Sequence, residues 1–323
     1  MTTTEPSKPR SRRRFAAFTL GLVLAPVAAE VGYRVLRVSS LSPTTNPLYV
    51  VHDDELGWRY APNSIARHTT AEFDVEIAIN SDGFRGPDWP GSKRGQRVLV
   101  LGDSFAFGWG VRDEETFAAR LRRAHPEWEV LNVAVSGYAT DQELLLLRRL
   151  RERADPDVVV CVFCPNDLME ASSDVVYGKS KPRFSARGPG LALENVPVPR
   201  SWLERTSALW RAWKKTRWER ANRERVFDAE KEWELVLALF ETMRAELAPV
   251  PLVIVSGEER LARFSAERVG TRHVDVRPGL ESSPAPTGFP IDGHWNAHGH
   301  ELVSRALASE IARALATALE DRR

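Results

Sequence analysis

The chain has 323 residues, 43% hydrophobic and 28% charged, which is enough for one large domain or two smaller ones. Its formal net charge is +1, but residues 1–14 carry +4 (five Lys or Arg against one Glu) and residues 204–225 carry +5 (eight against three), so the remainder sums to −8. This distribution excludes a globally basic surface for nucleic acid. The two cysteines, Cys161 and Cys164, are too few for a four-cysteine zinc site. On an extended strand they point to opposite faces, which disfavours a disulfide.

The N-terminal segment has the order of a targeting sequence. Basic residues at positions 8–14 precede fifteen uncharged, mainly apolar residues at 15–29. A spanning helix needs about 20 apolar residues and a signal-peptide core about 7–15, so the run suits a cleaved signal peptide or an anchor extended to Val35. Residues 11–15 also match a twin-arginine export signal. Both interpretations place the remainder outside the cytoplasm, since the basic end stays inside. The alternative is a buried helix of a soluble domain.

Three parts follow from this organisation. Residues 1–38 form the basic N-terminus with the signal peptide or membrane anchor, and residues 39–96 form a polar linker and a small β-rich lead-in. Residues 97–320 form the main domain, with an insertion at about 171–227. Within the lead-in, alternation of apolar and polar residues predicts one half-buried strand, whose apolar face consists of Phe73, Val75, Ile77 and Ile79.

In the main domain, short apolar runs alternate with helical patterns. The predicted strands cover residues 98–101, 128–133, 157–163, 251–255 and 273–276. The predicted helices cover residues 116–124, 141–153, 230–247 and 296–319. This alternation predicts an α/β fold, a three-layer α/β/α sandwich with a mostly parallel central sheet. In such sheets the functional site lies outside the carboxyl ends of the strands.

The insertion interrupts this rhythm with a tract of four tryptophans at positions 202, 210, 213 and 218, interleaved with six Lys or Arg. Three interpretations remain open for this tract. It can be an ordinary helix with Trp inside and Arg outside. It can be a lid whose aromatic faces stack on carbohydrate, or a helix lying on an anionic membrane surface.

Polar residues that suit acyl chemistry follow three of the predicted strands and occupy one late loop. Ser104 comes directly after the first strand, where a nucleophile would lie. Gly137 follows the second strand and permits close approach of a backbone N–H. Asn166 follows the third strand and can donate to a developing oxyanion. Asp292 and His294 share one loop and can supply a general base with its orienting partner.

Each of these residues also has a purely structural interpretation. A serine after a strand is commonly a helix N-cap, and Gly137 and Asn166 suit turns. His298 and His300, expected to be solvated on the first turn of the last helix, are rivals to His294 as the base. The occurrence of the whole set in order favours the functional interpretation.

This order resembles the SGNH (GDSL-like) family of ester hydrolases over about residues 97–320. The blocks that match are Gly102-Asp103-Ser104-Phe105, then Gly137, then Asn166, then the Asp292/His294 loop. Most members have Asp and His three apart, whereas here they are two apart and followed by Trp295. That DxHW form is similar to the SGNH-like domains of alginate O-acetyltransferases.

The resemblance implies that His294 deprotonates Ser104 while Asp292 orients the imidazole, and that Ser104, Gly137 and Asn166 form the oxyanion hole. It implies no metal and no organic cofactor. The expected function is a serine-dependent ester hydrolase outside the cytoplasm, with O-deacetylation of carbohydrate as a candidate. The expected partners are a small acyl ester or acylated carbohydrate, and a membrane through the N-terminal segment, but no nucleic acid. The alternatives are an O-acetyltransferase that modifies an exported polysaccharide, or a non-catalytic glycan-binding module.

Overall fold

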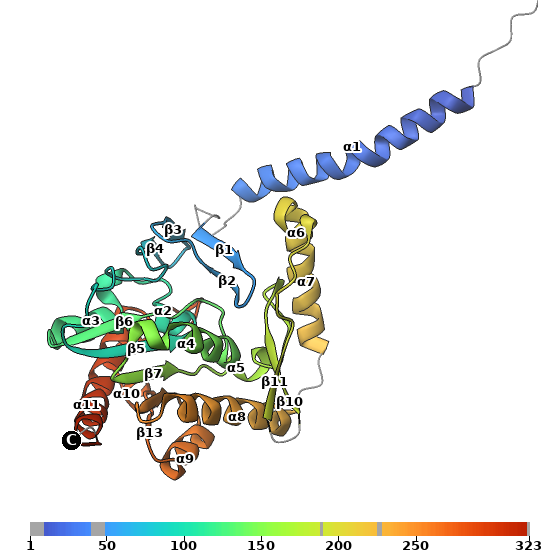
Figure 1. Cartoon of the computed structure of the whole chain (residues 1–323). Coiled ribbons are helices and arrows are strands. Elements are labelled where there is room, and N and C mark those ends of the chain that lie inside the picture. Colours follow the sequence, from blue (N-terminus) through green and yellow to red (C-terminus); the bar gives the residue numbers. More distant parts are fainter. Residues whose placement is uncertain (1–9, 40–48, 188–189, 225–227, 322–323) are drawn as a thin grey trace, which may run out of the picture.

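The structure is a computed structural model that describes residues 10–39, 49–187, 190–224 and 228–321 (Figure 1). The basic residues before position 10 and the expected polar linker from residue 40 onwards lie outside the described residues.

A five-stranded parallel sheet forms the centre of the molecule, in the order β13-β12-β7-β5-β6. The strands are β5 (Gln96–Gly102), β6 (Trp128–Asn132), β7 (Val158–Val162), β12 (Leu252–Val255) and β13 (Thr271–Val274). Every strand lies within two residues of its predicted bounds. The chain reverses direction across the sheet at β5, which has β6 on one side and β7 on the other. Ligands of open α/β sheets bind at this kind of switch point.

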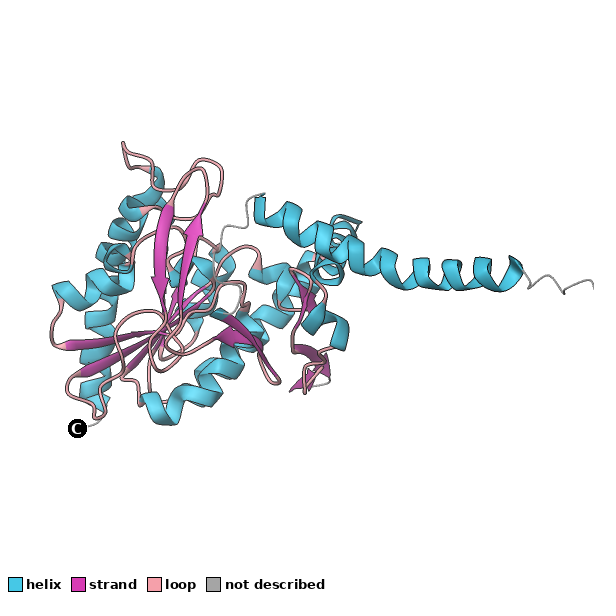
Figure 2. Cartoon of the chain, turned by 90° about the horizontal axis from the view of Figure 1, so that it is seen from above, coloured by secondary structure: helices cyan, strands magenta, loops and turns pink. Residues whose placement is uncertain are grey.

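Helices cover both faces of the sheet, as Figure 2 shows. Helices α3 (Phe117–Ala124) and α11 (Ala297–Asp321) contact one another, and α4 (Thr140–Ala154) contacts α8 (Ala229–Leu247). Right-handed crossovers on either side of β5 place these two pairs on opposite faces. The predicted three-layer α/β/α sandwich is therefore confirmed. Shorter helical elements are α2 (Ser104–Phe107), η2 (Asp113–Glu115), α5 (Asp167–Glu170), α9 (Glu259–Glu267) and α10 (Arg277–Glu281).

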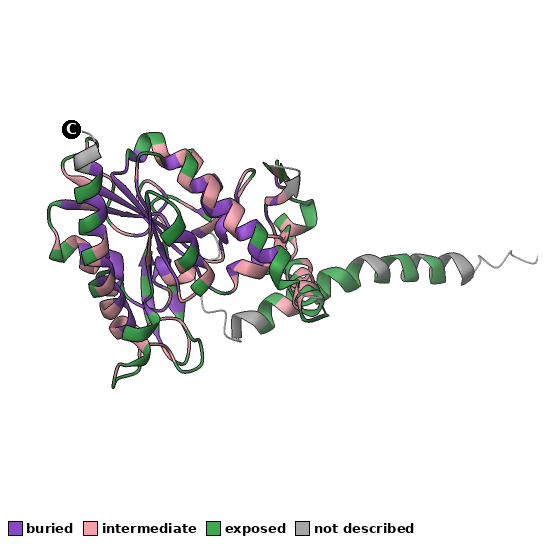
Figure 3. Ribbon diagram, turned by 90° about the horizontal axis from the view of Figure 1, so that it is seen from below, coloured by how far each residue is buried: buried purple, intermediate pink, exposed green. Residues whose placement is uncertain are grey.

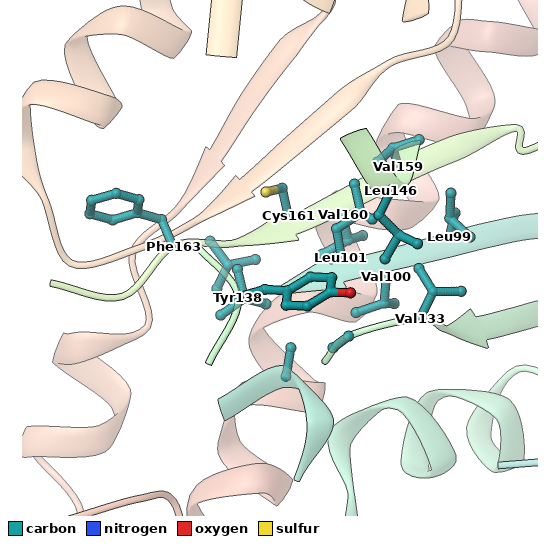
Figure 4. Close-up of a cluster of buried hydrophobic side chains, with 14 of the residues drawn as sticks. Leu99, Val100, Leu101, Val133, Tyr138, Leu146, Val159, Val160, Cys161 and Phe163 are labelled. Carbon is teal, nitrogen blue, oxygen red and sulfur yellow. The ribbon is translucent and has the colours of Figure 1, made fainter. Parts of the chain in front are cut away.

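The core lies on both faces of the sheet. Leu99 and Leu101 of β5 and Val159 of β7 are fully buried, and Leu146 of α4 packs above them (Figure 4). Burial of one such side chain contributes roughly 1.5–3 kcal/mol. Figure 3 shows the buried residues concentrated on the sheet and on the inner sides of its helices. The carboxyl ends of β5, β6 and β7 are thereby held rigidly.

The lead-in consists of two hairpins. Strand β1 (Val50–Asp53) pairs with β2 (Gly57–Tyr60), and β3 (Ile65–Thr69) pairs with β4 (Asp74–Ala78), both antiparallel. On β4, Val75 and Ile77 are buried and their neighbours exposed, which confirms the predicted alternation. The sequence analysis did not separate the other three strands.

Arg85 joins the lead-in to the main domain. Its buried guanidinium donates to the carbonyl oxygens of Phe107 (3.2 Å), Gly108 (2.5 Å) and Val111 (2.6 Å). Burial lowers the pKa of Arg85 to about 10. These carbonyls belong to the segment that follows Ser104, so the lead-in supports the region of the expected nucleophile.

The insertion contains two hairpins and two helices. The pairs are β8 (Val175–Val176) with β9 (Lys179–Ser180) and β10 (Arg183–Arg187) with β11 (Gly190–Glu194), and the helices are α6 (Trp202–Thr206) and α7 (Ala208–Glu224). Trp202 and Trp213 are 69% and 48% exposed. Simple packing with Trp inside is therefore wrong for these two residues.

Helix α1 (Arg10–Ser39) projects from the molecule, and its C-terminal half lies beside α6 and α7 (Figure 1). Its segment Phe18–Leu36 has a mean hydropathy of 1.4, and none of that window is buried. By length and composition this is the one helix among the described residues that can cross a membrane, and a signal sequence meets the same criterion. Glu30 of α1 binds the start of α7, where it accepts from the Ala208 N–H (2.7 Å) and the Leu209 N–H (3.1 Å).

Candidate active site

Ser104 begins helix α2 immediately after the central strand β5. The Asp103 carboxylate accepts the N–H of Phe105 at 2.9 Å and caps this short helix. Gly102 adopts φ +148°, and a Cβ there would lie 2.6 Å from the Ala106 side chain. Glycine is thus required at the turn that presents Ser104 at the edge of the sheet.

Ser104, His294 and Asp292 form a continuous hydrogen-bonded chain. The Ser104 Oγ lies 2.6 Å from His294 Nε2, and His294 Nδ1 is hydrogen-bonded to Asp292 Oδ1. Both contacts are satisfied when Nδ1–H donates to the carboxylate and Nε2 accepts the serine proton, a tautomer assigned from the partners. Gly293 between the two residues adopts φ +85°, which turns the chain so that a two-residue spacing suffices.

The Asp292–His294 loop is held by contacts from two directions. Glu72, in the turn between β3 and β4, accepts the backbone N–H groups of Ile291 and Asp292, each at 2.8 Å. The Phe105 ring lies 4.6 Å from the His294 ring, centroid to centroid. The lead-in therefore helps to position the loop that carries both partners of Ser104.

The rival histidines lie elsewhere. His300 is buried and accepts the N–H of Phe117 through Nδ1 at 3.3 Å, and burial lowers its pKa to about 3. The expectation that His300 is solvated was wrong, because α11 packs its first turn against α3. His298 Nε2 lies 3.0 Å from Ser283 Oγ. Of the three candidates, His294 is the one hydrogen-bonded to Ser104.

A pocket of about 670 Å³ opens over Ser104. Asp292, His294 and Gly137 line it together with Ser104. The rest of its wall consists of residues from the lead-in, the insertion, the loop after α2 and the loop after β6: Tyr49, Val50, Trp58, Tyr60, Trp109, Ser136, Tyr177, Lys179 and Lys215. Sequence reasoning missed this wall, although the aromatic cluster at residues 58–60 was a signal for it.

Of the three expected oxyanion-hole residues, Ser104 and Gly137 line the pocket and Asn166 does not. Gly137 adopts φ +80° beside the pocket, and a Cβ there would lie 3.1 Å from the Tyr177 ring. Within the described chain, the N–H groups of Ser104 and Gly137 have no recorded acceptor. Asn166 is not part of the pocket lining, because its amide donates to Glu170 Oε2 at 3.3 Å and also hydrogen-bonds to Asp103. The role of all three remains a prediction.

A group of buried acids lies beneath the site and escaped the sequence analysis. Its members are Asp103, Asp141, Glu143, Asp167 and Glu170. Burial raises the pKa of all five, to about 6 for Asp141, about 8 for Glu143 and about 7 for Glu170. Two of these acids lie in the polar run at residues 140–143, a pattern that is typical of an exposed helix start. The sequence therefore contains no signal that this run is buried.

Two partners stabilise members of this acid group. Lys181 Nζ lies 2.5 Å from Asp141, and both side chains are fully buried. Cys161 donates its S–H to Glu143 at 3.1 Å, so this buried thiol is free and structural. Among the described residues, no group of three or more His, Cys, Asp or Glu side chains is arranged to hold a metal ion.

Comparison with known protein families gives a match over most of the chain. The model of the GDSL-like Lipase/Acylhydrolase family matches residues 100–302, a range that contains Ser104, Asp292 and His294. No curated protein matches.

The chain is also similar to several solved structures. One is TesA (14% identity, TM-score 0.43, covering 68% of this chain and 99% of that one). Another is the psychrotrophic esterase EstA from Pseudoalteromonas sp. (15% identity, TM-score 0.42, covering 68% of this chain and 98% of that one). A third is a catalytic mutant of Axe2, an acetylxylan esterase from Geobacillus stearothermophilus (17% identity, TM-score 0.37, covering 68% of this chain and 96% of that one).

Proposed function

The chain belongs to the GDSL-like lipase/acylhydrolase family and is an ester-bond hydrolase, and from this premise we propose that it uses Ser104 as nucleophile outside the cytoplasm. The observation that carries the proposal is the hydrogen-bonded chain from Ser104 through His294 to Asp292. A serine hydroxyl is a weak nucleophile until an adjacent base removes its proton, and this arrangement supplies that base.

The proposed reaction has two acyl-transfer steps. Ser104 Oγ attacks the ester carbonyl while its proton passes to His294 Nε2. The alcohol then leaves with that proton, and an acyl-serine remains. Water attacks this acyl group, gives a proton to His294 and releases the carboxylic acid, after which His294 returns the proton to Ser104. Asp292 stabilises the imidazolium in both steps.

We propose that the backbone N–H groups of Ser104 and Gly137 hold the oxyanion, with Asn166 as the third donor. The free N–H groups beside the pocket support the first two donors. Asn166 can donate only after its amide turns away from Glu170 toward the pocket. Loss of one such donor typically costs about 2.7–4 kcal/mol of transition-state stabilisation.

The proposed location rests on helix α1. A basic N-terminus followed by an apolar helix orients the chain with residues after the helix outside the cytoplasm. The exposed apolar surface of the Phe18–Leu36 segment supports a membrane environment, as an anchor or as a signal sequence. An acylated carbohydrate is the proposed substrate class, because Trp109 and Tyr177 line the pocket without being fully buried and can offer flat faces to a sugar ring.

The test is hydrolysis of p-nitrophenyl acetate and longer acyl esters by the full-length chain in detergent micelles. Ser104→Ala and His294→Ala should each lower kcat by about 10⁴-fold or more, because either change removes the activated nucleophile. Ser256→Ala is a matched control, because Ser256 Oγ lies 2.8 Å from His273 Nε2 in a serine–histidine contact outside the pocket. This control should keep its activity.

Three outcomes would contradict the proposal. Retained activity in His294→Ala would show that another group is the base. Loss of activity in a folded Ser256→Ala variant would make Ser256 a rival to Ser104 as the nucleophile. A wild-type chain inactive on every ester, but active in acyl transfer to a glycan acceptor, would make it a transferase.

A further inference from the structure

The pocket is larger than an acetyl group requires, and two cations line it. These are Lys179 and Lys215, which share the wall with Ser104 and the aromatic residues. Lys179 Nζ lies 4.6 Å from the centroid of the Trp58 ring. Among the described residues it has no carboxylate partner within ion-pair distance. The nearest recorded carboxylate of Lys215 is Glu219 at 3.8 Å, and the Lys215 side chain is 53% exposed.

The fold places these two lysines together by a direct backbone contact. Gly178, in the turn between β8 and β9, adopts φ +74°, and a Cβ there would lie 2.6 Å from the Lys215 backbone nitrogen. The turn that carries Tyr177 and Lys179 is therefore pressed against α7. Lys179 and Lys215 therefore lie on neighbouring elements of the pocket wall.

The cationic surface continues beyond the pocket. A second hollow of about 140 Å³ shares Val50, Trp58 and Lys179 with the first. Arg200 and Arg211 also line this hollow. The two hollows thus adjoin one another at the three residues that they share.

Few carboxylates oppose these cations. Asp292 is engaged by His294, and Glu204 in the second hollow pairs with Lys214. A low-dielectric cleft lined by one sign of charge concentrates ligands of the opposite sign.

We propose that the substrate of this site is an acyl ester on an acidic saccharide, whose carboxylate binds Lys179 and Lys215 while its ring stacks on Tyr177, which is 40% exposed. This inference rests on the proposed esterase function and names its substrate class. A sugar carries its carboxylate and its acyl groups on one rigid ring, so a cation beside the reacting serine can hold the ester in place. Arg200, which lines the adjoining hollow, offers a further cation to the next acidic residue of an oligomer.

The ionisation of Lys179 gives this contact a pH signature. Partial removal from water, and then repulsion from Lys215, lower the pKa of Lys179 to about 8. Below that pH the ammonium is charged and attracts the carboxylate. As the pH rises through about 8 the proton is lost, and the preference for acidic substrates should decline.

The test compares acetylated tri-galacturonate with acetylated xylotriose, an uncharged sugar, using the full-length chain in detergent micelles. The kcat/KM for the acidic substrate should exceed that for the neutral one by about tenfold or more, mainly through KM. The double variant Lys179→Gln/Lys215→Gln should lower this ratio by about tenfold, so that the two sugars are cleaved about equally well, whereas Lys179→Arg should keep the ratio. Lys231→Gln, which changes an exposed lysine of α8 outside both hollows, is the control.

Several results would overturn the inference. One is equal turnover of the two sugars, and another is an unchanged ratio in the double variant with normal thermal unfolding. Preferential, lysine-dependent cleavage of a lysophospholipid would assign the cations to a lipid phosphate instead. Failure of the wild type on p-nitrophenyl acetate would defeat the esterase proposal itself, so the two failures are distinguishable.

Discussion

At the scale of single residues, Glu72 is the contact between the lead-in and the catalytic loop. Its carboxylate accepts two N–H groups, from Ile291 and Asp292, and so fixes the residue that orients His294. The role of Glu72 is positional, since it lies outside the pocket lining. Such contacts matter because small displacements of catalytic groups are costly in rate.

We predict that Glu72→Ala lowers kcat for p-nitrophenyl acetate by about tenfold, equivalent to about 1.4 kcal/mol, with little change in KM. Glu72→Gln keeps one acceptor oxygen and should recover part of the loss. The control is Glu76→Ala, an exposed position on β4 of the same hairpin. Equal kinetics of Glu72→Ala and wild type would show that the loop holds its shape without this carboxylate.

At the scale of elements, the sequence predicted the strands and helices whose apolar residues repeat with a regular period. It did not predict the elements that depend on tertiary contacts. The strands and long helices of the sheet were found, because alternate or 3.6-residue apolar patterns mark them. The two-residue strands β8 and β9 are too short to show a period, so the hairpin that carries Tyr177 was not anticipated.

The candidate site shows the same division. Ser104, Asp292 and His294 were predicted from their places at strand ends and on one loop, and the structure brings them into contact. The cations and aromatic residues of the outer pocket come from segments far apart in sequence. Only the packing of the lead-in and α7 around the sheet brings those segments together.

The junction of α1 with α7 gives a prediction at this scale. Glu30 caps α7 from another helix by accepting the N–H groups of Ala208 and Leu209. Loss of a helix cap typically costs about 1 kcal/mol, so Glu30→Ala should raise amide hydrogen exchange at residues 208–210 by roughly fivefold. Val31→Ala, at an exposed position on α1, is the matched control. Unchanged exchange in Glu30→Ala would mean that the start of α7 is held by its other contacts.

At the scale of the whole molecule, the buried acids make the free energy of unfolding depend on pH. Glu143 has an ordinary pKa of 4.5 and a folded pKa of about 8. The folded chain therefore retains a proton that the unfolded chain releases, and stability is lost as the pH rises between these values. The buried His68 and His300 oppose this trend, because their lowered pKa values cost stability as the pH falls below 6.5.

Because these groups act in opposite directions, we predict how the free energy of unfolding of a variant differs from that of the wild type at each pH, and not the pH dependence of the wild type alone. Glu143→Gln should become more stable relative to wild type as the pH rises from 5 to 8, by up to about 1.4 kcal/mol per pH unit. Urea unfolding at several pH values measures this difference, with the exposed Glu234→Gln as control. Parallel pH curves for wild type and Glu143→Gln would show that the carboxyl does not stay protonated in the folded state.

The contact between α1 and α7 has a consequence for where the enzyme can work. Lys215 lies seven residues after Ala208, which is roughly 10 Å along a helix axis. With the uncharged residues 15–29 of α1 in a bilayer, as we propose, Glu30 and the start of α7 lie at the lipid surface, and the pocket stays within a short height of it. The enzyme then searches for substrate in two dimensions. It would act on polymer strands as they emerge at the membrane and leave those in more distant layers untouched.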